Sequence, residues 1–207
     1  MIFEACVGNY KEGKKAEELG ANRIELCDNL DQGGTTPGYG TIFMAKQKIN
    51  IPIMVIIRPR GGNFIYSKDE IEIMKKDIKI CKDLGVYGVV LGVLNEDNTL
   101  NKERLKELVE ESKPLKLTFH MAFDEIEDKF TALEDIIDLG FNRILTKGCS
   151  TNALDGKEKI KELIAKANNR ILILPGGGLN KDNYKEFSLF TGAVEVHGTK
   201  IIGNLNN

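Results

Sequence analysis

The sequence lacks the run of ~20 consecutive apolar residues that a membrane-spanning helix needs, so we expect no membrane partner. Its first residues, Met1-Ile2-Phe3-Glu4, lack the basic start of a secretory signal peptide. A net charge of −2 gives no electrostatic reason to expect a nucleic acid partner. The four cysteines form no close pair motif, which suits a reducing compartment in which thiols stay free. These absences together predict a cytoplasmic protein.

What is present is an ordinary globular composition, with 42% hydrophobic and 29% charged residues. A chain of 207 residues is long enough to bury one sizeable core. We therefore expect a single domain that covers residues 1–207.

A repeated pattern of helix, glycine and strand runs along the chain. Four amphipathic segments end at glycines of the kind that cap helices, and a β-branched run follows each glycine almost at once. These runs cover residues 23–26, 88–91, 143–146 and 193–196. A second set of apolar runs fills the gaps, at residues 2–7, 53–57, 115–119 and 171–174. Eight strands that alternate with helices predict an α/β fold, a single (β/α)8 TIM barrel.

The helices between these strands show their own signals. Ser67-Lys68-Asp69-Glu70 is a capping box that predicts the start of a helix. Similar amphipathic segments lie at 101–111, 130–139, 156–167 and 181–187. The eighth strand ends near His197 and leaves only residues 198–207, so the eighth helix must be short or missing. A partner subunit would cover the open side, which predicts a homodimer or a higher homo-oligomer.

Polar residues collect where the predicted strands end, on the face where barrel enzymes carry their chemistry. Because side chains alternate along a strand, each inward glutamate shares a face with the cysteine or histidine two residues after it. Carboxylate, imidazole and guanidinium groups would form an acid–base and anion-binding set. The alternative is an ion-pair network that only fills the barrel. The residues concerned are Glu4, Glu25, Glu195, His120, His197, Arg58 and Arg60.

Three glycines, Gly176, Gly177 and Gly178, follow the seventh strand and precede a helix that we expect to begin near Asn180. Backbone N–H groups of such a turn can hold a phosphate or a carboxylate, and this position is the usual phosphate site of a barrel. The alternative is a tight turn that needs positive φ.

The four cysteines fall into different environments. Cys81 lies on the apolar stripe of a predicted helix and is expected in the core, and Cys149 follows the sixth strand in a loop. Cys6 and Cys27 end neighbouring strands, which lie ~4.8 Å apart. Two thiols at similar height could bind a soft metal such as Cu(I). The alternative is that both pack as small hydrophobic residues.

These residues resemble the CutC family, which is named for copper homeostasis. The resemblance covers nearly the whole chain in the same order. Its segments include Glu4-x-Cys6, Arg23-Ile24-Glu25-Leu26-Cys27, Ile57-Arg58-Pro59-Arg60-Gly61-Gly62, Thr118-Phe119-His120, Ala122-Phe123-Asp124, Pro175-Gly176-Gly177-Gly178 and Glu195-x-His197. It implies a cytoplasmic TIM barrel, often dimeric or larger, in which Cys6 and Cys27 bind Cu(I). The chain departs from the family pattern at Met121 and Lys147, which replace an arginine and a serine, and at Gly198-Thr199-Lys200.

Two functions follow from this sequence. The first is a copper homeostasis protein with Cu(I) at Cys6 and Cys27 and no organic cofactor. The alternative is a lyase-like or isomerase-like enzyme that acts on a small anionic, phosphorylated or carboxylated metabolite. Its acid–base residues would be Glu4, Glu25, His120 and His197. Its substrate-binding residues would be Arg58, Arg60, Asp124, Gly176, Gly177 and Gly178.

Overall fold

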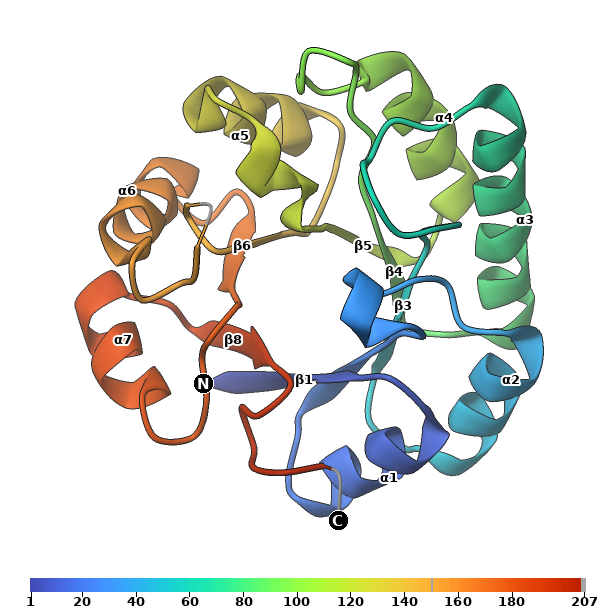
Figure 1. Ribbon diagram of the computed structural model, residues 1–207, viewed down its shortest axis with the longest axis horizontal. Helices are drawn as coiled ribbons and strands as arrows, with labels where there is room; N and C mark the ends of the chain where they lie inside the picture. Colours follow the sequence, from blue (N-terminus) through green and yellow to red (C-terminus); the bar gives the residue numbers. More distant parts are fainter. Residues whose placement is uncertain (150, 206–207) are drawn as a thin grey trace.

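The computed structural model describes residues 1–149 and 151–205, in which eight parallel strands form a nearly closed barrel ringed by helices (Figure 1). The strand order is β7-β6-β5-β4-β3-β2-β1-β8. The TIM-barrel prediction is therefore confirmed. The strands are β1 (Ile2–Val7), β2 (Arg23–Leu26), β3 (Ile53–Ile56), β4 (Gly88–Leu91), β5 (Lys116–Phe119), β6 (Arg143–Thr146), β7 (Leu172–Pro175) and β8 (Glu195–Gly198).

Seven α-helices alternate with these strands in the described chain. They are α1 (Tyr10–Glu18), α2 (Tyr39–Lys48), α3 (Lys68–Leu84), α4 (Lys102–Ser112), α5 (Lys129–Asp138), α6 (Lys157–Ala167) and α7 (Tyr184–Thr191). Short 3-10 helices cover Leu30–Gln32 and Met121–Glu125. Among the described residues, no helix is both long and apolar enough to cross a membrane.

Local signals set the bounds of several helices. The Ser67 hydroxyl accepts a hydrogen bond from the Glu70 amide, and the Glu70 carboxylate accepts one from the Ser67 amide, so the predicted capping box opens α3. Gly85 ends the same helix at φ +68°, a conformation that glycine adopts without strain.

Side chains alternate between two environments along each strand. On β1, Ala5 and Val7 face the helices and join the main hydrophobic core, whereas Glu4 and Cys6 face the inside of the barrel. The main core therefore lies between the sheet and the ring of helices. The barrel interior holds polar and sulfur-bearing side chains beside apolar ones such as Ile56, and chemistry can occur there.

Strand β1 joins the two ends of the sequence, because it pairs with β2 on one side and with β8 on the other. The described residues form no ladder between β7 and β8. A single isolated bridge, between Asn180 and Lys200, links the segments that follow these strands. The prediction that strands one, two and eight are neighbours is confirmed, and their inward residues meet.

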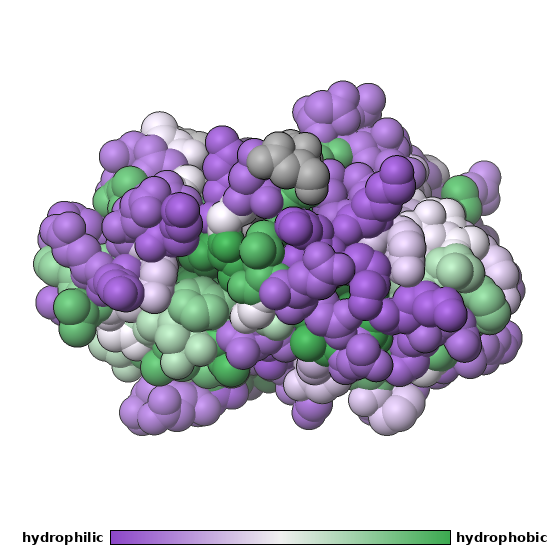
Figure 2. All heavy atoms as spheres, turned by 90° about the horizontal axis from the view of Figure 1, so that it is seen from below, coloured by the Kyte–Doolittle hydropathy of each residue, from purple (hydrophilic) through white to green (hydrophobic). Residues whose placement is uncertain are grey.

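The eighth helix is missing from the described residues, as the sequence predicted. Residues 199–205 instead run in turns toward α1 (Figure 1). Ile201 and Leu205 are buried in the same core as Val196, so this segment covers β8 in place of a helix. Figure 2 views this side of the barrel and shows hydrophobic residues gathered between polar margins.

The expected helix start near Asn180 is wrong, because α7 begins at Tyr184. The side-chain oxygen of Asn180 accepts hydrogen bonds from the amides of Asp182 and Asn183, which forms a turn in place of the first helical residues. The three glycines therefore do not adjoin a helix N-terminus, and their interpretation as an anion site loses that support.

Candidate functional site

A cavity of about 530 Å³ opens at the C-terminal ends of the strands. It lies on the face where barrel enzymes carry their active sites. Several of the predicted residues line it, and apolar side chains complete its walls. The lining comprises Cys6, Glu25, Cys27, Leu30, Gly33, Ile56, Arg58, Phe64, His120, Met121, Leu145, Gly177, Gly178, Leu179, Asn180, His197, Gly198, Thr199 and Lys200.

A thiol pair lies at one side of this cavity. Cys6 on β1 stands beside Glu25 on β2 in the strand register, and Cys27 follows two residues later on the same face. One ligand atom from each of these three buried residues lies within 4.8 Å of the others. Sulfur and carboxylate groups this close could hold a metal ion.

The two thiols differ in protonation. A hydrogen bond from the Cys27 thiol, together with the hydrogen bond and charge of His197, lowers the pKa of Cys6 to about 5 despite its burial. The same hydrogen bond to Cys6, with burial and the charge of Glu25, raises the pKa of Cys27 well above its usual value. At neutral pH Cys6 is therefore a thiolate and Cys27 is a thiol donor.

His197 and Glu25 extend this charge cluster. Burial alone would lower the pKa of His197, but its hydrogen bonds to Cys6 and Glu4 hold that pKa well above the usual value. Burial and the Cys6 charge raise the pKa of Glu25 to about 8. The His197 Nε2 atom lies 3.6 Å from Glu25 Oε2. At neutral pH the cluster thus holds an imidazolium beside a thiolate and a protonated carboxyl group.

An ion-pair network lies beneath the cavity. His197 Nδ1 donates to Glu4 Oε1 at 2.9 Å, and Glu4 also pairs with Arg23. Burial would raise the pKa of Glu4, but the hydrogen bond from His197 and the charge of Arg23 lower it to about 2. Arg23 Nη2 lies 2.6 Å from Glu195, which Arg143 also contacts at 2.9 Å.

The predicted glutamates therefore divide between cavity and network. Glu25 lines the cavity, whereas Glu4 and Glu195 belong to the network below it. Sequence reasoning missed Arg23 and Arg143 as members of this network. Arg23 precedes Glu25 by two residues on the same strand, so strand alternation could have placed it inside the barrel.

A second wall of the cavity carries Arg58 and His120. The Arg58 guanidinium lies over the Phe64 ring, 4.9 Å from its centroid, and the His120 ring lies 4.7 Å from the same ring. Burial and the nearby Arg58 charge lower the pKa of His120 to about 3, so this histidine is neutral at physiological pH. His120 is therefore neutral, whereas His197 is protonated.

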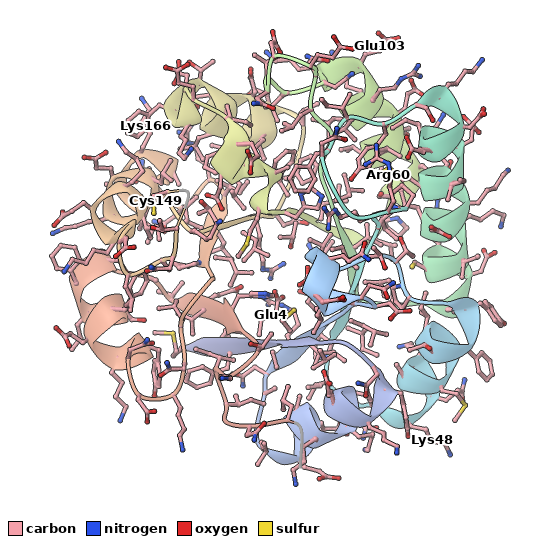
Figure 3. The ribbon with its side chains drawn as sticks, in the orientation of Figure 1. Glu4, Lys48, Arg60, Glu103, Cys149 and Lys166 are labelled. Atoms are coloured by element: carbon pink, nitrogen blue, oxygen red, sulfur yellow. The ribbon has the colours of Figure 1, made fainter. Side chains whose placement is uncertain are left out.

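Other predicted substrate-binding residues are absent from the described cavity lining. Arg60 pairs with Glu70 at 2.5 Å, and Asp124 accepts a hydrogen bond from the Lys147 amide at 3.0 Å. Figure 3 shows Glu4 at the centre of the ring of strands, with Arg60 toward α3 and Cys149 toward α6. Arg60 and Asp124 therefore organise loops around the mouth.

The glycine triplet contributes two residues to the cavity. Gly177 and Gly178 line it with φ of +86° and +88°, as a tight turn requires, and Gly176 packs behind them against Leu145 and His197. Lys200 and Met121 both line the cavity, and Met121 stands where the family pattern has an arginine. A cation therefore remains available at the mouth.

The similarity of this chain to known proteins extends over nearly its whole length. The model of the CutC family matches residues 1–202. The chain belongs to the CutC family. A human relative, named copper homeostasis protein cutC homolog, is 46% identical over 197 residues, which cover 95% of this chain and 72% of the human protein. The CutC protein of Enterococcus faecalis is 45% identical over 209 residues, covering 98% of this chain and all of that protein.

Solved structures agree with this assignment to the CutC family. A crystal structure of CutC from Streptococcus agalactiae superposes with a TM-score of 0.94 at 39% identity and covers 97% of this chain and 99% of that chain. A structure entitled "QR15, an Aldolase" has a TM-score of 0.72 at 16% identity, covering 99% of this chain and 92% of its own. The second likeness shows a shared barrel fold alone.

Proposed function

We propose that this CutC protein acts in copper homeostasis by binding Cu(I) through Cys6 and Cys27 at the mouth of the barrel. The observation that carries the proposal is the buried group of Cys6, Glu25 and Cys27, whose ligand atoms lie within 4.8 Å of one another. Thiolates are the ligands that Cu(I) prefers, and Cys6 is already deprotonated at neutral pH. The names of the relatives agree with this role.

A Cu(I) titration against a competing chelator tests the proposal. We expect one Cu(I) per chain in the native protein and loss of that binding in Cys6→Ser/Cys27→Ser. Cys149→Ser is the matched control, because Cys149 is a free thiol near the mouth that lies outside the described group. Unchanged affinity in the double variant would remove these two residues as the site.

We also propose a cellular location and an oligomeric state for this protein. Free cysteines suit a reducing cytoplasm, so we propose a cytoplasmic location. Among the residues that the structure describes, no helix follows β8 to cover one side of the barrel, so we also propose a homodimer that contacts this side. Fractionation of cells that express the tagged chain tests the location.

A second candidate function is an enzyme of the lyase or isomerase type, acting on a small anionic metabolite. Its supporting observation is Glu25, whose Oε1 atom is buried without a hydrogen-bond partner in the described residues and whose pKa is about 8. A carboxyl group with a pKa near the working pH is suited to acid–base catalysis. Glu25 and His197 are then the acid–base pair in the cavity, Glu4 supports His197, and His120 donates a hydrogen bond.

A metabolite panel tests this enzyme, with product detection by mass spectrometry. We expect turnover of one anionic compound, reduced about 10²-fold or more in Glu25→Gln, since a positioned acid–base group typically contributes that much. Equal turnover in Glu25→Gln and the native protein would exclude Glu25 from the chemistry.

A further inference from the structure

Three arginines are buried in this barrel, and one of them lacks a carboxylate. Arg23 pairs with Glu4 and Glu195, and Arg143 pairs with Glu195. Arg58 is 4% exposed, and within residues 1–149 and 151–205 no carboxylate pairs with it. A buried cation without a counter-charge is costly, so this position favours an anion from outside the chain.

Backbone carbonyl groups hold the Arg58 side chain in place. Its Nη1 donates to the carbonyls of Gln32 and Gly34 at 2.9 Å each, and its Nη2 donates to Gly62 at 2.6 Å. These bonds tie the loops after β2 and β3 to one guanidinium group. The remaining Nε–H is buried and makes no hydrogen bond among the described residues, and the Tyr66 hydroxyl interacts with the same guanidinium group. This Nε–H is a fixed donor on a residue that lines the cavity.

His120 presents a second donor of the same kind. Its Nδ1 accepts a hydrogen bond from the Ala122 amide at 3.2 Å, so the proton of the neutral ring is on Nε2. That Nε2 atom is buried, and the described residues offer it no partner. A Cβ atom at Gly92 would lie 2.7 Å from the ring, so only glycine leaves space for His120 in this orientation.

Phe64 connects the two donors. Its ring centroid lies 4.9 Å from the Arg58 guanidinium carbon and 4.7 Å from the His120 ring centroid. Arg58, Phe64 and His120 therefore form one continuous wall of the cavity. We call it the Arg58–His120 wall. It carries one fixed positive charge and two unpartnered N–H groups.

We infer that the Arg58–His120 wall binds the carboxylate of a small organic acid. One carboxylate oxygen accepts from Arg58 Nε–H and the other accepts from His120 Nε2–H, which satisfies both buried donors and pairs the buried charge. Two donors match the two oxygens of a carboxylate better than the three oxygens of a phosphate group. Apolar side chains of the lining, among them Ile56 and Leu145, face the rest of the molecule.

This inference rests on the second candidate function and names its ligand class. It is independent of Cu(I) binding, because neither donor belongs to the Cys6, Glu25 and Cys27 group. The cavity of about 530 Å³ accepts a metabolite-sized acid.

Calorimetric titration of the chelator-treated, full-length protein tests the inference. The probes are sodium acetate, lactate and malonate, with sodium chloride at matched ionic strength and inorganic phosphate as comparisons. We expect at least one carboxylate to bind, with little effect of chloride. Loss of one charge-assisted hydrogen bond should weaken that binding about tenfold or more in His120→Phe, which keeps an aromatic ring beside Phe64.

Two arginines of the same loop provide the matched variants. Arg58→Lys keeps the charge but removes Nε–H, and we expect it to weaken carboxylate binding as His120→Phe does. Arg60→Lys is the control, because Arg60 pairs with Glu70 and is not among the cavity-lining residues described. Nitrogen NMR of His120 adds a direct measurement, since the Nε2–H resonance should shift when the carboxylate binds.

Three results would overturn the inference. They are no binding of any carboxylate, unchanged affinity in both His120→Phe and Arg58→Lys, and tighter binding of inorganic phosphate than of every carboxylate. The Cys6→Ser/Cys27→Ser variant separates the proposals, because it should bind the carboxylate and fail to bind Cu(I). A carboxylate that binds without turnover would leave the inference intact and contradict the enzyme.

Discussion

At the scale of single residues, two cysteine side chains at this site differ in their protonation state. Cys6 is a thiolate and Cys27 a thiol, although one lies on β1, the other directly follows the adjacent β2, and both line one cavity. Each thiol shifts the pKa of the other, because the proton retained by Cys27 stabilises the charge on Cys6. Reactivity at this site should therefore begin at Cys6.

We predict that the thiolate absorbance of Cys6 titrates with a midpoint near pH 5, well below the usual value of 9. The change should disappear in Cys6→Ser and persist in Cys149→Ser. Because the pKa of Cys6 is lowered from 9.0 to about 5 in the folded state, its contribution to stability is lost progressively as the pH falls between these two values. A midpoint near 9 in the native protein would contradict the proposed thiolate.

His120 should remain neutral across the physiological range. Its pKa is lowered from 6.5 to about 3, so nitrogen NMR should show one neutral tautomer, protonated on Nε2, from about pH 5 to pH 8. Since the unfolded chain takes up this proton below 6.5 and the folded chain does not, stability should fall as the pH decreases from 6.5 toward 3. His120→Phe should reduce that loss. An imidazolium spectrum at pH 6 would be inconsistent with the prediction.

At the scale of elements, the loops at the mouth depend on a few anchored side chains. Arg58 holds the loops that follow β2 and β3, and the capping box at Ser67 fixes where the second of these loops becomes α3. A rigid loop keeps the cavity wall in place before a ligand arrives.

Ser67→Ala should destabilise the protein by about 1 kcal/mol, the usual cost of losing an N-cap side chain. Denaturant unfolding with an unchanged slope would measure this difference. Ser67→Thr keeps an acceptor oxygen and should stay close to the native value. Equal loss in the alanine and threonine variants would show that the cap contributes little.

At the scale of the whole molecule, the barrel is asymmetric because no helix follows β8 within the described residues. Residues 199–205 cover β8, and exposed apolar side chains remain nearby, with Met1 at 50% and Val194 at 58% exposure. The main-chain hydrogen bond from the Ile2 amide to the Val194 carbonyl joins the starts of β1 and β8. This side is the surface that we propose for dimer formation.

Light scattering after gel filtration should give the mass of a dimer for the native chain. Val194→Lys places a charge in the proposed contact and should shift the mass toward that of a monomer. Ile73→Lys is the control, because Ile73 is similarly exposed on α3, on another side of the barrel. A monomeric native chain, or a dimer unaffected by Val194→Lys, would contradict this interface.

Much of the fold follows from local rules. Gly85 and Gly192 end helices, and strand alternation places Glu4, Glu25 and His197 inside the barrel. These features depend on neighbours in sequence, so a single chain reveals them. The start of α7 was missed because the Asn180 side chain competes for the same amides that a helix would use.

The sequence by itself determined the eight strands and the end of the barrel at which the reactive side chains lie. Only the tertiary structure decided how these side chains act. Arg60, predicted to bind substrate, pairs with Glu70, and burial with the Arg58 charge lowers the pKa of His120, which was predicted as an acid–base group. Protonation and pairing depend on burial and on charges from distant strands. Those strands become neighbours only when the barrel forms.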